Sequence, residues 1–241
     1  MIVTTDLKIV AGCLTLATLS GLMFLSALPP LGFFPLGLVC LVPLIVALER
    51  SPLWLTPLLG MLFGLVAFIS IPYSLIAWGW DVTGYSMLML AGYFGLLGVA
   101  PKLLQRIPGL GSVWTAFPLA YALIQWIGEA LVSIPVLLAV VLPLDMVDAR
   151  SLFQLFGGRG VDYLLCGFNA LVAGAVLSRG KGQRYALISA IAACVSTAVV
   201  VLAAPQPEVE SSSSLQVATI DNSVGFSRAA QIPFVPSIRD Q

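Results

Sequence analysis

One stretch of the chain is apolar for long enough to cross a membrane and carries positive charge at one end only. It runs from Val161 to Ser178, and a basic cluster follows at once, formed by Arg179, Lys181 and Arg184. At about 1.5 Å per residue, a helix of this length covers most of the roughly 30 Å hydrocarbon core of a bilayer. Short cytoplasmic loops collect Lys and Arg, so the cluster predicts that this end faces the cytoplasm.

Composition places the whole chain in the same class of protein. Hydrophobic residues make up 59% of the sequence and charged residues 9%, whereas a soluble domain carries roughly a quarter charged residues. The chain is therefore predicted to be an integral membrane protein. Its net charge of zero gives no electrostatic reason to expect nucleic acid as a partner.

The residue types present also limit the chemistry. The chain has no His, which excludes His-dependent triads, His-ligated metal sites and haem held by imidazole. Its cysteines each lie in apolar sequence without a Cys-x-x-Cys pair, which predicts free, buried thiols rather than disulfides or metal ligands. We therefore expect no metal and no cofactor. The four cysteines are Cys13, Cys40, Cys166 and Cys194.

The apolar stretches predict an all-α fold, a polytopic membrane helix bundle of about seven transmembrane helices. Proline ends the first stretch and lies inside the second, where a membrane helix tolerates it if neighbours satisfy the freed carbonyls. The first stretch is too long for a signal peptide and is interpreted as a retained crossing. The predicted spans are Ile9–Leu28, Leu31–Leu48, Leu53–Trp78, about Ser86–Pro101, Val113–Ile127, Val161–Ser178 and Tyr185–Ala204.

The distribution of Lys and Arg predicts a cytoplasmic amino terminus. With seven crossings, the loops Glu49–Pro52, Lys102–Ser112 and Arg179–Arg184 lie inside. These loops and the amino terminus hold seven basic residues, against two in the outer loops before the last span. The seven are Lys8, Arg50, Lys102, Arg106, Arg179, Lys181 and Arg184, and the two are Arg150 and Arg159.

Four features between and within the spans carry further predictions. Trp78, Trp80 and Tyr85 surround Asp81 in a predicted interfacial loop before the fourth span. Gly60 and Gly64 have the small-xxx-small spacing of closely packed helices. The segment 128–156 contains an apolar run too short to cross, 134–144, and is interpreted as an interfacial or re-entrant arm on the outer side. Gly157 and Gly158 predict a hinge before the sixth span.

The composition changes after the seventh span and divides the chain into three predicted regions. Residues 1–204 form the transmembrane helical domain, and 205–214 are a Pro/Ser-rich linker. Residues 215–241 are a short extracytoplasmic tail, which begins as one β-strand, Leu215–Ile220, because that run is β-branched and partly alternating.

Three landmarks, in this order, resemble apolipoprotein N-acyltransferase. Ala27–Leu44 is similar to the family's proline-bracketed turn into its second helix, Gly157–Leu171 to its Gly-bearing lead-in and Asn-Ala-Leu helix, and Leu215–Asn222 to the first strand of its nitrilase-like catalytic domain. The resemblance implies a multi-pass protein of the bacterial inner membrane. It also implies phospholipid-dependent N-acylation in lipoprotein biosynthesis, and that residues 215–241 are the remnant or the start of a nitrilase-like domain.

The chain departs from this family where chemistry is expected. At the end of the fifth span the family's Glu-Trp/Phe-Leu-Arg run is replaced by Gln125–Gly128. Ser133–Val136 stands where Gly-Phe-Pro-Trp is usual, and Asp221-Asn222 where the strand usually ends in Gln-Gly-Asn. The catalytic domain of the family uses a Glu base, a Lys and a Cys nucleophile, and this chain has none of these residue types after Glu210. We therefore assign no catalytic residue, and expect a truncated or split member that is inactive alone.

Several residues are candidates for contact with lipid or with other helices. Phe33, Phe34, Trp78 and Trp80 are candidates for lining an acyl-chain groove, and an interfacial aromatic belt explains them equally. Arg159 is a candidate for a lipid phosphate, with a loop-capping role as the alternative. For Asn169 we favour a hydrogen bond between helices. Glu129 and Asp162 lie near span ends, where solvation is favoured over a functional role.

Three functions are compatible with these patterns. The first is the membrane half of an N-acyltransferase, with membrane lipid or a phospholipid donor and a separate nitrilase-like domain as partners. The second is a non-catalytic membrane scaffold or partner-binding subunit of the same family. The third, a small transporter, ranks last, because the sequence has neither a deep charge pair nor an internal repeat.

Overall fold

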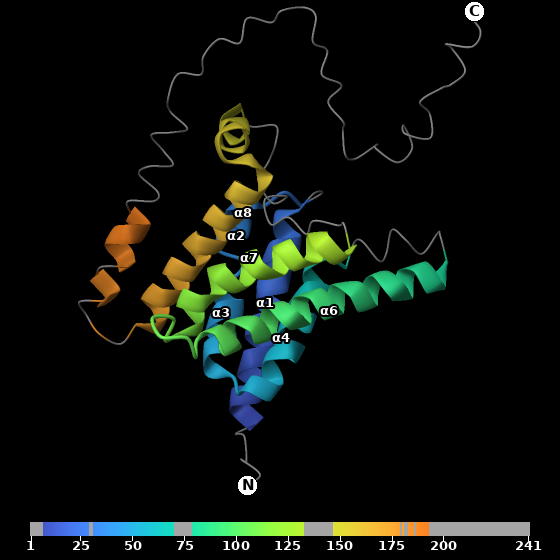
Figure 1. Ribbon diagram of the computed structural model, residues 1–241, viewed down its shortest axis with the longest axis horizontal. Helices are drawn as coiled ribbons and strands as arrows, with labels where there is room; N and C mark the ends of the chain where they lie inside the picture. Colours follow the sequence, from blue (N-terminus) through green and yellow to red (C-terminus); the bar gives the residue numbers. More distant parts are fainter. Residues whose placement is uncertain are drawn as a thin grey trace, which may run out of the picture. The chain divides into compact units, whose positions relative to one another are not determined.

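The computed structural model describes residues 7–28, 31–69, 79–132, 147–178, 180, 183–185 and 187–192, and side chains in these ranges except 129–132 and 147–155. These residues lie in the first of two units of the chain, Met1–Ala204. They form helices and no strand (Figure 1), in agreement with the predicted all-α class. The predicted linker and strand, in 205–241, lie outside the described residues.

Three of the described helices are long and apolar enough to cross a membrane. They are α1 (Leu7–Ala27), α6 (Trp80–Leu104) and the Phe156–Leu177 part of α8 (Val147–Leu177). They overlap the first, fourth and sixth predicted spans. The apolar segments Leu53–Ala67 and Val113–Gly128 are shorter. The count of seven crossings stays a prediction.

The second predicted span, Leu31–Leu48, is wrong as a single helix. It forms the four-residue α2 (Phe34–Gly37) and the nine-residue α3 (Val42–Arg50). Each helix has a proline in its first two positions, Pro35 and Pro43. Proline lacks the amide hydrogen that a helix interior needs, but the first turn has no use for that donor. Each proline therefore begins a helix. We call the four residues between them, Leu38–Leu41, the α2–α3 break.

The third and fifth predicted spans hold helices of different length. A 3₁₀ turn, Leu53–Leu55, leads into the 12-residue α4 (Thr56–Ala67), and the end of the third predicted span lies outside the described residues. In the fifth, α7 (Val113–Val132) continues five residues past the predicted end at Ile127. Pro118 lies inside α7, as membrane helices allow.

The predicted interfacial loop before the fourth span is wrong from Trp80 onwards. α6 begins at Trp80, so Asp81 lies in its first turn and Tyr85 in its second. Gly79 precedes the helix with φ +121°, a conformation that glycine adopts without steric cost. An acidic residue in the first turn also complements the positive end of the helix dipole. Trp80, Asp81 and Tyr85 therefore belong to the start of a helix and not to a loop.

The predicted Gly-Gly hinge is confirmed at its first residue. Gly157 has φ +67° and ψ +169°, which interrupts the helical backbone of α8. A side chain at this φ would be strained. The helix resumes toward Leu177, and the stretch before the hinge is also helical from Val147. Most of the predicted arm, residues 133–146, lies outside the described residues.

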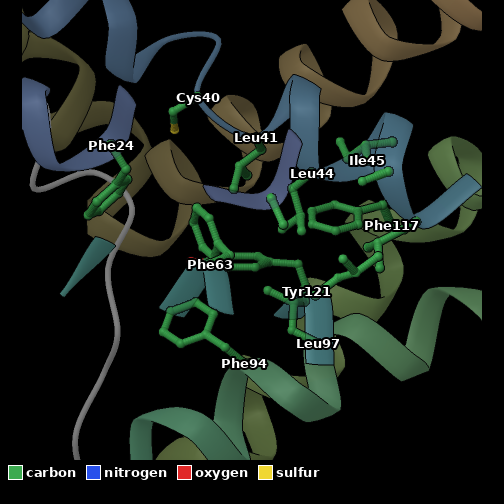
Figure 2. Close-up of a cluster of buried hydrophobic side chains, with 14 of the residues drawn as sticks. Phe24, Cys40, Leu41, Leu44, Ile45, Phe63, Phe94, Leu97, Phe117 and Tyr121 are labelled. Atoms are coloured by element: carbon green, nitrogen blue, oxygen red, sulfur yellow. The ribbon is translucent and has the colours of Figure 1, made fainter. Parts of the chain in front are cut away.

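The apolar core gathers around α3, which contacts α1, α4, α6, α7 and α8. Five consecutive residues of α3, Leu44–Leu48, are buried, as expected of a helix surrounded on all sides. Figure 2 shows side chains from the neighbouring helices meeting those of α3. The labelled members are Phe24, Cys40, Leu41, Leu44, Ile45, Phe63, Phe94, Leu97, Phe117 and Tyr121.

The predicted close packing at Gly60 and Gly64 is confirmed, and the partner is α6. A Cβ built on Gly60 would lie 2.0 Å from the carbonyl oxygen of Phe94, and one on Gly98 would lie 2.2 Å from that of Thr56. Neither position therefore admits a side chain without moving backbone. The ring of Phe94 covers Gly64 and packs edge-on against Phe63, with ring centroids 5.3 Å apart.

The cysteine prediction is confirmed for the three described thiols. Cys13, Cys40 and Cys166 are free and buried. Cys194 lies outside the described residues, as does most of the seventh predicted span. Within that span, the described residues 185 and 187–192 are helical.

Candidate functional site

Two groups of buried polar side chains join the helices of the bundle. Among the described residues the buried polar or charged ones are Ser20, Ser51, Thr56, Thr83, Gln125, Asp162 and Asn169. Ser51, Thr56 and Thr83 bond carbonyls within four residues of themselves, so they serve their own helix ends. The remaining residues reach across to other elements.

The first group satisfies the α2–α3 break. The amide nitrogen of Asn169 on α8 donates to the carbonyl of Leu38 at 2.9 Å, and its oxygen accepts from the backbone N–H of Leu41 at 2.9 Å. The hydroxyl of Ser20 on α1 donates to the carbonyl of Cys40. An unsatisfied backbone group costs several kcal/mol in an apolar medium. Side chains from two neighbouring helices therefore replace the hydrogen bonds that the break loses.

The second group, which we call the Asp162 cluster, joins α6, α7 and α8. Oδ2 of Asp162 accepts from the hydroxyl of Tyr121 at 3.0 Å and from the amide of Gln125 at 3.0 Å. The same amide reaches the Tyr121 oxygen at 3.2 Å, and the hydroxyl of Tyr93 on α6 donates to Oε1 of Gln125 at 3.0 Å. Tyr121 and Gln125 stand one helical turn apart on α7, so both face the carboxyl group on α8.

The interpretation of Asp162 as a solvated residue near a span end is wrong. Its side chain is 0% exposed, and Tyr121 and Gln125 are 1% and 2% exposed. Two donors on one oxygen offset the loss of water around the carboxyl group. The side chain of Glu129, the other residue interpreted in this way, is outside the described set.

The structure places the lipid-contact candidates on three separate elements. Phe33 precedes α2 and is 61% exposed, and Phe34 is the half-buried first residue of α2. Trp80 is the first residue of α6 and is 76% exposed. Arg159 is exposed on α8, two residues after the break at Gly157. Trp78 lies outside the described residues. Their contact with lipid stays a prediction.

A further polar region lies at the opposite ends of these helices. The carboxylate of Glu49 accepts from the backbone N–H of Val113, at the start of α7, at 2.7 Å. Lys102, in the last turn of α6, donates to the carbonyl of Glu49 at 3.0 Å. The ends of α3 and α6 and the start of α7 are thus tied together. These ends belong to the segments Glu49–Pro52 and Lys102–Ser112, which the charge pattern predicts to lie on one side of the membrane.

A cavity of about 960 Å³ opens beside these contacts. It lies between the end of α3, the start of α7 and the end of α8, and we call it the α3–α7–α8 cavity. Its lining residues are Glu49, Arg50, Gly111, Ser112, Trp114, Thr115, Val176, Leu177, Ser178 and Gln183.

Sequence reasoning missed both the Asp162 cluster and this cavity. The signal for the cluster was the spacing of Tyr121 and Gln125, two hydrogen-bonding side chains one turn apart in an otherwise apolar span. The cavity was harder to predict from the sequence, because Glu49, Ser112 and Ser178 come close to one another only when the helices pack.

Comparison with known families shows the family to which the chain belongs. Residues 20–171 match the family model described as the apolipoprotein N-acyltransferase N-terminal domain. The chain belongs to this family. The match extends from Ser20 to Leu171, so it includes the α2–α3 break, the Asp162 cluster and Asn169. No curated protein sequence matches the chain. As a member of the apolipoprotein N-acyltransferase N-terminal domain family, the chain is related to a membrane-embedded acyltransferase module.

Proposed function

We propose that this chain is the membrane module of an N-acyltransferase that acts on lipoproteins. In this proposal the module spans the bacterial inner membrane several times and holds a phospholipid donor near its outer face. A nitrilase-like domain supplies the nucleophile there, and the C-terminal tail of the chain is extracytoplasmic. The observation that carries the proposal is the family match over residues 20–171.

The described geometry supports a module that binds the phospholipid donor and does not itself catalyse acyl transfer. Phe33 and Phe34 follow α1, and Trp80 begins α6, so these aromatic residues stand where the predicted topology has its outer face. Arg159 lies at the same predicted level, after the hinge in α8. Exposed aromatic rings suit the membrane interface, and a guanidinium group binds phosphate oxygens in pairs. The proposed donor lies among these residues.

The same proposal holds that the 241-residue polypeptide does not acylate by itself. Acyl transfer through a covalent intermediate needs an activated nucleophile, a base and donors for the oxyanion. The described cysteines are 3%, 2% and 0% exposed at Cys13, Cys40 and Cys166. A substrate carbonyl therefore has no access to these thiols. The proposal therefore assigns the acyl-transfer chemistry to a nitrilase-like domain.

The test is an acylation assay on the purified polypeptide in lipid. Phospholipid and a diacylated lipopeptide are supplied, with or without a nitrilase-like domain of the family, and triacylated product is sought by mass spectrometry. We expect product only when the domain is added, and less product with Arg159→Gln than with the control Arg106→Gln, a change of an exposed arginine at the other end of the bundle. The product in both arms is compared with that of the added domain alone.

Two results would change the proposal. Product formed without the added domain and lost on replacing one cysteine would show that the polypeptide is itself catalytic. Tight binding of the domain without any product would favour the second function, a non-catalytic scaffold or partner-binding subunit of the family.

A further inference from the structure

The α3–α7–α8 cavity has the size and position of a binding site that the proposed acyl transfer does not use. Its volume of about 960 Å³ falls in the upper part of the roughly 300–1,000 Å³ range of small-molecule sites. It lies at the ends of α3 and α8 and the start of α7, whereas the proposed donor site lies at the opposite ends of the helices. The predicted topology places the cavity at the cytoplasmic surface of the membrane.

One part of the cavity lining offers hydrogen-bond acceptors. The hydroxyl of Thr115 donates to the carbonyl of Ser112 at 2.8 Å, and that of Ser178 donates to the carbonyl of Gly174 at 2.6 Å. Their protons are therefore engaged. The Thr115 oxygen already accepts from the backbone N–H of Ser112 at 3.4 Å and contacts the Ser112 hydroxyl at 3.1 Å, so the lone pairs of Ser178 are what remains for a ligand. The carboxylate of Glu49 lies in the same lining. The α3 and α8 helices both end here, and the carbonyls at helix ends carry partial negative charge.

Another part of the lining offers positive charge. Arg50 is the last residue of α3, is exposed, and is the one cationic side chain among the described residues that line the cavity. Its guanidinium group presents donors in a fork that matches phosphate oxygens. The side-chain amide of Gln183 adds further donors in the lining.

The rest of the wall is apolar. Trp114, Val176 and Leu177 line the cavity beside the polar groups. Indole rings are common at the membrane interface, where one side of the ring meets lipid and the other meets water. A ligand that fits all three parts has an ammonium group, a phosphate group and an attached apolar portion.

We propose that the α3–α7–α8 cavity binds the head group of a zwitterionic phospholipid that carries a primary ammonium group. The phosphate pairs with Arg50, and the ammonium donates to Glu49 and to the hydroxyl oxygen of Ser178. The apolar portion follows Trp114 and the end of α8 into the bilayer. This lipid is distinct from the proposed acyl donor and holds α3, α7 and α8 together at this end of the bundle.

Native mass spectrometry of the delipidated full chain tests this site with three lipids of matched acyl chains. Phosphatidylethanolamine is expected to bind about tenfold more tightly than phosphatidylcholine, whose quaternary ammonium has no hydrogen to donate. Phosphatidylglycerol, which has no cation and meets Glu49, is expected to bind more weakly than phosphatidylethanolamine. Glycerophosphoethanolamine, the same head group without acyl chains, is expected to compete poorly.

Two charge-removing variants separate the two halves of the site. Arg50→Gln is expected to weaken the binding of all three lipids by about tenfold, because each carries a phosphate. Glu49→Gln keeps a carbonyl oxygen for the N–H of Val113 but removes the negative charge. It is expected to abolish the preference for phosphatidylethanolamine over phosphatidylcholine while leaving phosphatidylglycerol binding unchanged or stronger. An unfolded Glu49→Gln variant would lose all three lipids, so retained phosphatidylglycerol binding shows that this variant is folded.

Arg106→Gln is the matched control, because Arg106 is exposed at the same end of α6 but does not line the cavity. Its lipid binding is expected to equal that of the unmodified chain. Unchanged binding in Arg50→Gln, or a retained ethanolamine preference in Glu49→Gln, would overturn the proposal. Equal affinity for glycerophosphoethanolamine and the intact lipid would show that the cavity takes a soluble head group instead. Because the readout is lipid binding, these results do not depend on acyl transfer.

Discussion

Single polar residues decide how this apolar bundle is held together. Asn169 supplies one donor and one acceptor to a backbone that the prolines have interrupted. Gln125 occupies the position where the family resemblance led us to expect Glu, and its amide donates to Asp162. A second carboxylate at this position would place two like charges in a buried site. Gln125 therefore adds no second charge beside Asp162.

The Asp162 cluster predicts that the shape of this residue matters more than its charge. Asp162→Asn keeps an oxygen that can accept from Tyr121 and Gln125, so its stability is expected to stay within about 1 kcal/mol of the original. Asp162→Leu leaves both donors without that acceptor and is expected to cost about 2–3 kcal/mol. Thermal unfolding in detergent, followed by circular dichroism, measures the difference.

Leu164→Ala provides the control for this pair. Leu164 lies two residues further along α8, is 50% exposed, and is expected to change stability by less than Asp162→Leu. If Asp162→Asn proves as destabilising as Asp162→Leu, the negative charge itself is needed, and a role for Asp162 in moving or holding a proton becomes the better explanation.

At the residue scale, the sequence was informative where a pattern was local. An amide deep in an apolar span predicted a hydrogen bond between helices at Asn169, and the structure shows one. The partners of Asp162 were not predictable in this way, because Tyr121 lies 41 positions earlier. The packing of the helices decides which face of α7 meets α8. Without that information, the position of Asp162 near a span end predicts a solvated side chain.

At the scale of elements, small residues and prolines determine where helices lie close and where they stop. The spacing of Gly60 and Gly64 predicted close packing, and the structure shows α6 as the partner. Apolar length alone was a poorer guide. It merged α2 and α3 into one span, because hydropathy does not register that Pro35 and Pro43 are both at helix starts. Apolar length also placed the start of the fourth span at about Ser86 instead of Trp80, because Trp80 and Asp81 resemble an interfacial loop.

The α4–α6 contact predicts that a single methyl group at Gly60 disrupts the bundle. In Gly60→Ala the new Cβ would overlap the carbonyl oxygen of Phe94, and backbone atoms cannot rotate away as a side chain does. We expect a loss of about 2–3 kcal/mol, at the upper end of overpacking costs. Chemical or thermal unfolding in the same detergent measures it.

The matched control for Gly60→Ala is Gly92→Ala on α6. A Cβ on Gly92 meets no atom within 4 Å, and alanine is the better helix former by roughly 1 kcal/mol. Gly92→Ala is therefore expected to leave stability unchanged or raise it. Equal losses in the two variants would mean that the tight α4–α6 crossing does not form in the membrane.

At the scale of the whole molecule, the contacts around Glu49 bear on the orientation of the chain. Lys102 and the start of α7 both bond Glu49, so the ends of α3 and α6 lie together. Ser178, at the end of α8, lines the adjacent cavity. The described ends of α3, α6 and α8 and the start of α7 therefore meet at one end of the bundle. The predicted topology places these ends on the same side of the membrane, and the side that they face stays a prediction.

The orientation can be tested with reporter fusions after Arg50, Lys102, Lys181 and Ser214. Seven crossings with the amino terminus inside predict that only the last fusion is extracytoplasmic, because this topology has seven basic residues on the inner side and two in the outer loops before the last span. The fusion after Arg50 is the most sensitive, since the α2–α3 break raises the alternative that this segment re-enters the membrane without crossing it. In that case Arg50 would lie on the same side as the end of α1, outside the cytoplasm.

An alkaline phosphatase fusion, active only outside, and a green fluorescent protein fusion, fluorescent inside, report each site independently. Phosphatase activity after Arg50, or fluorescence after Ser214, would contradict the predicted topology, and the first of these would also separate Glu49 from the cytoplasmic leaflet.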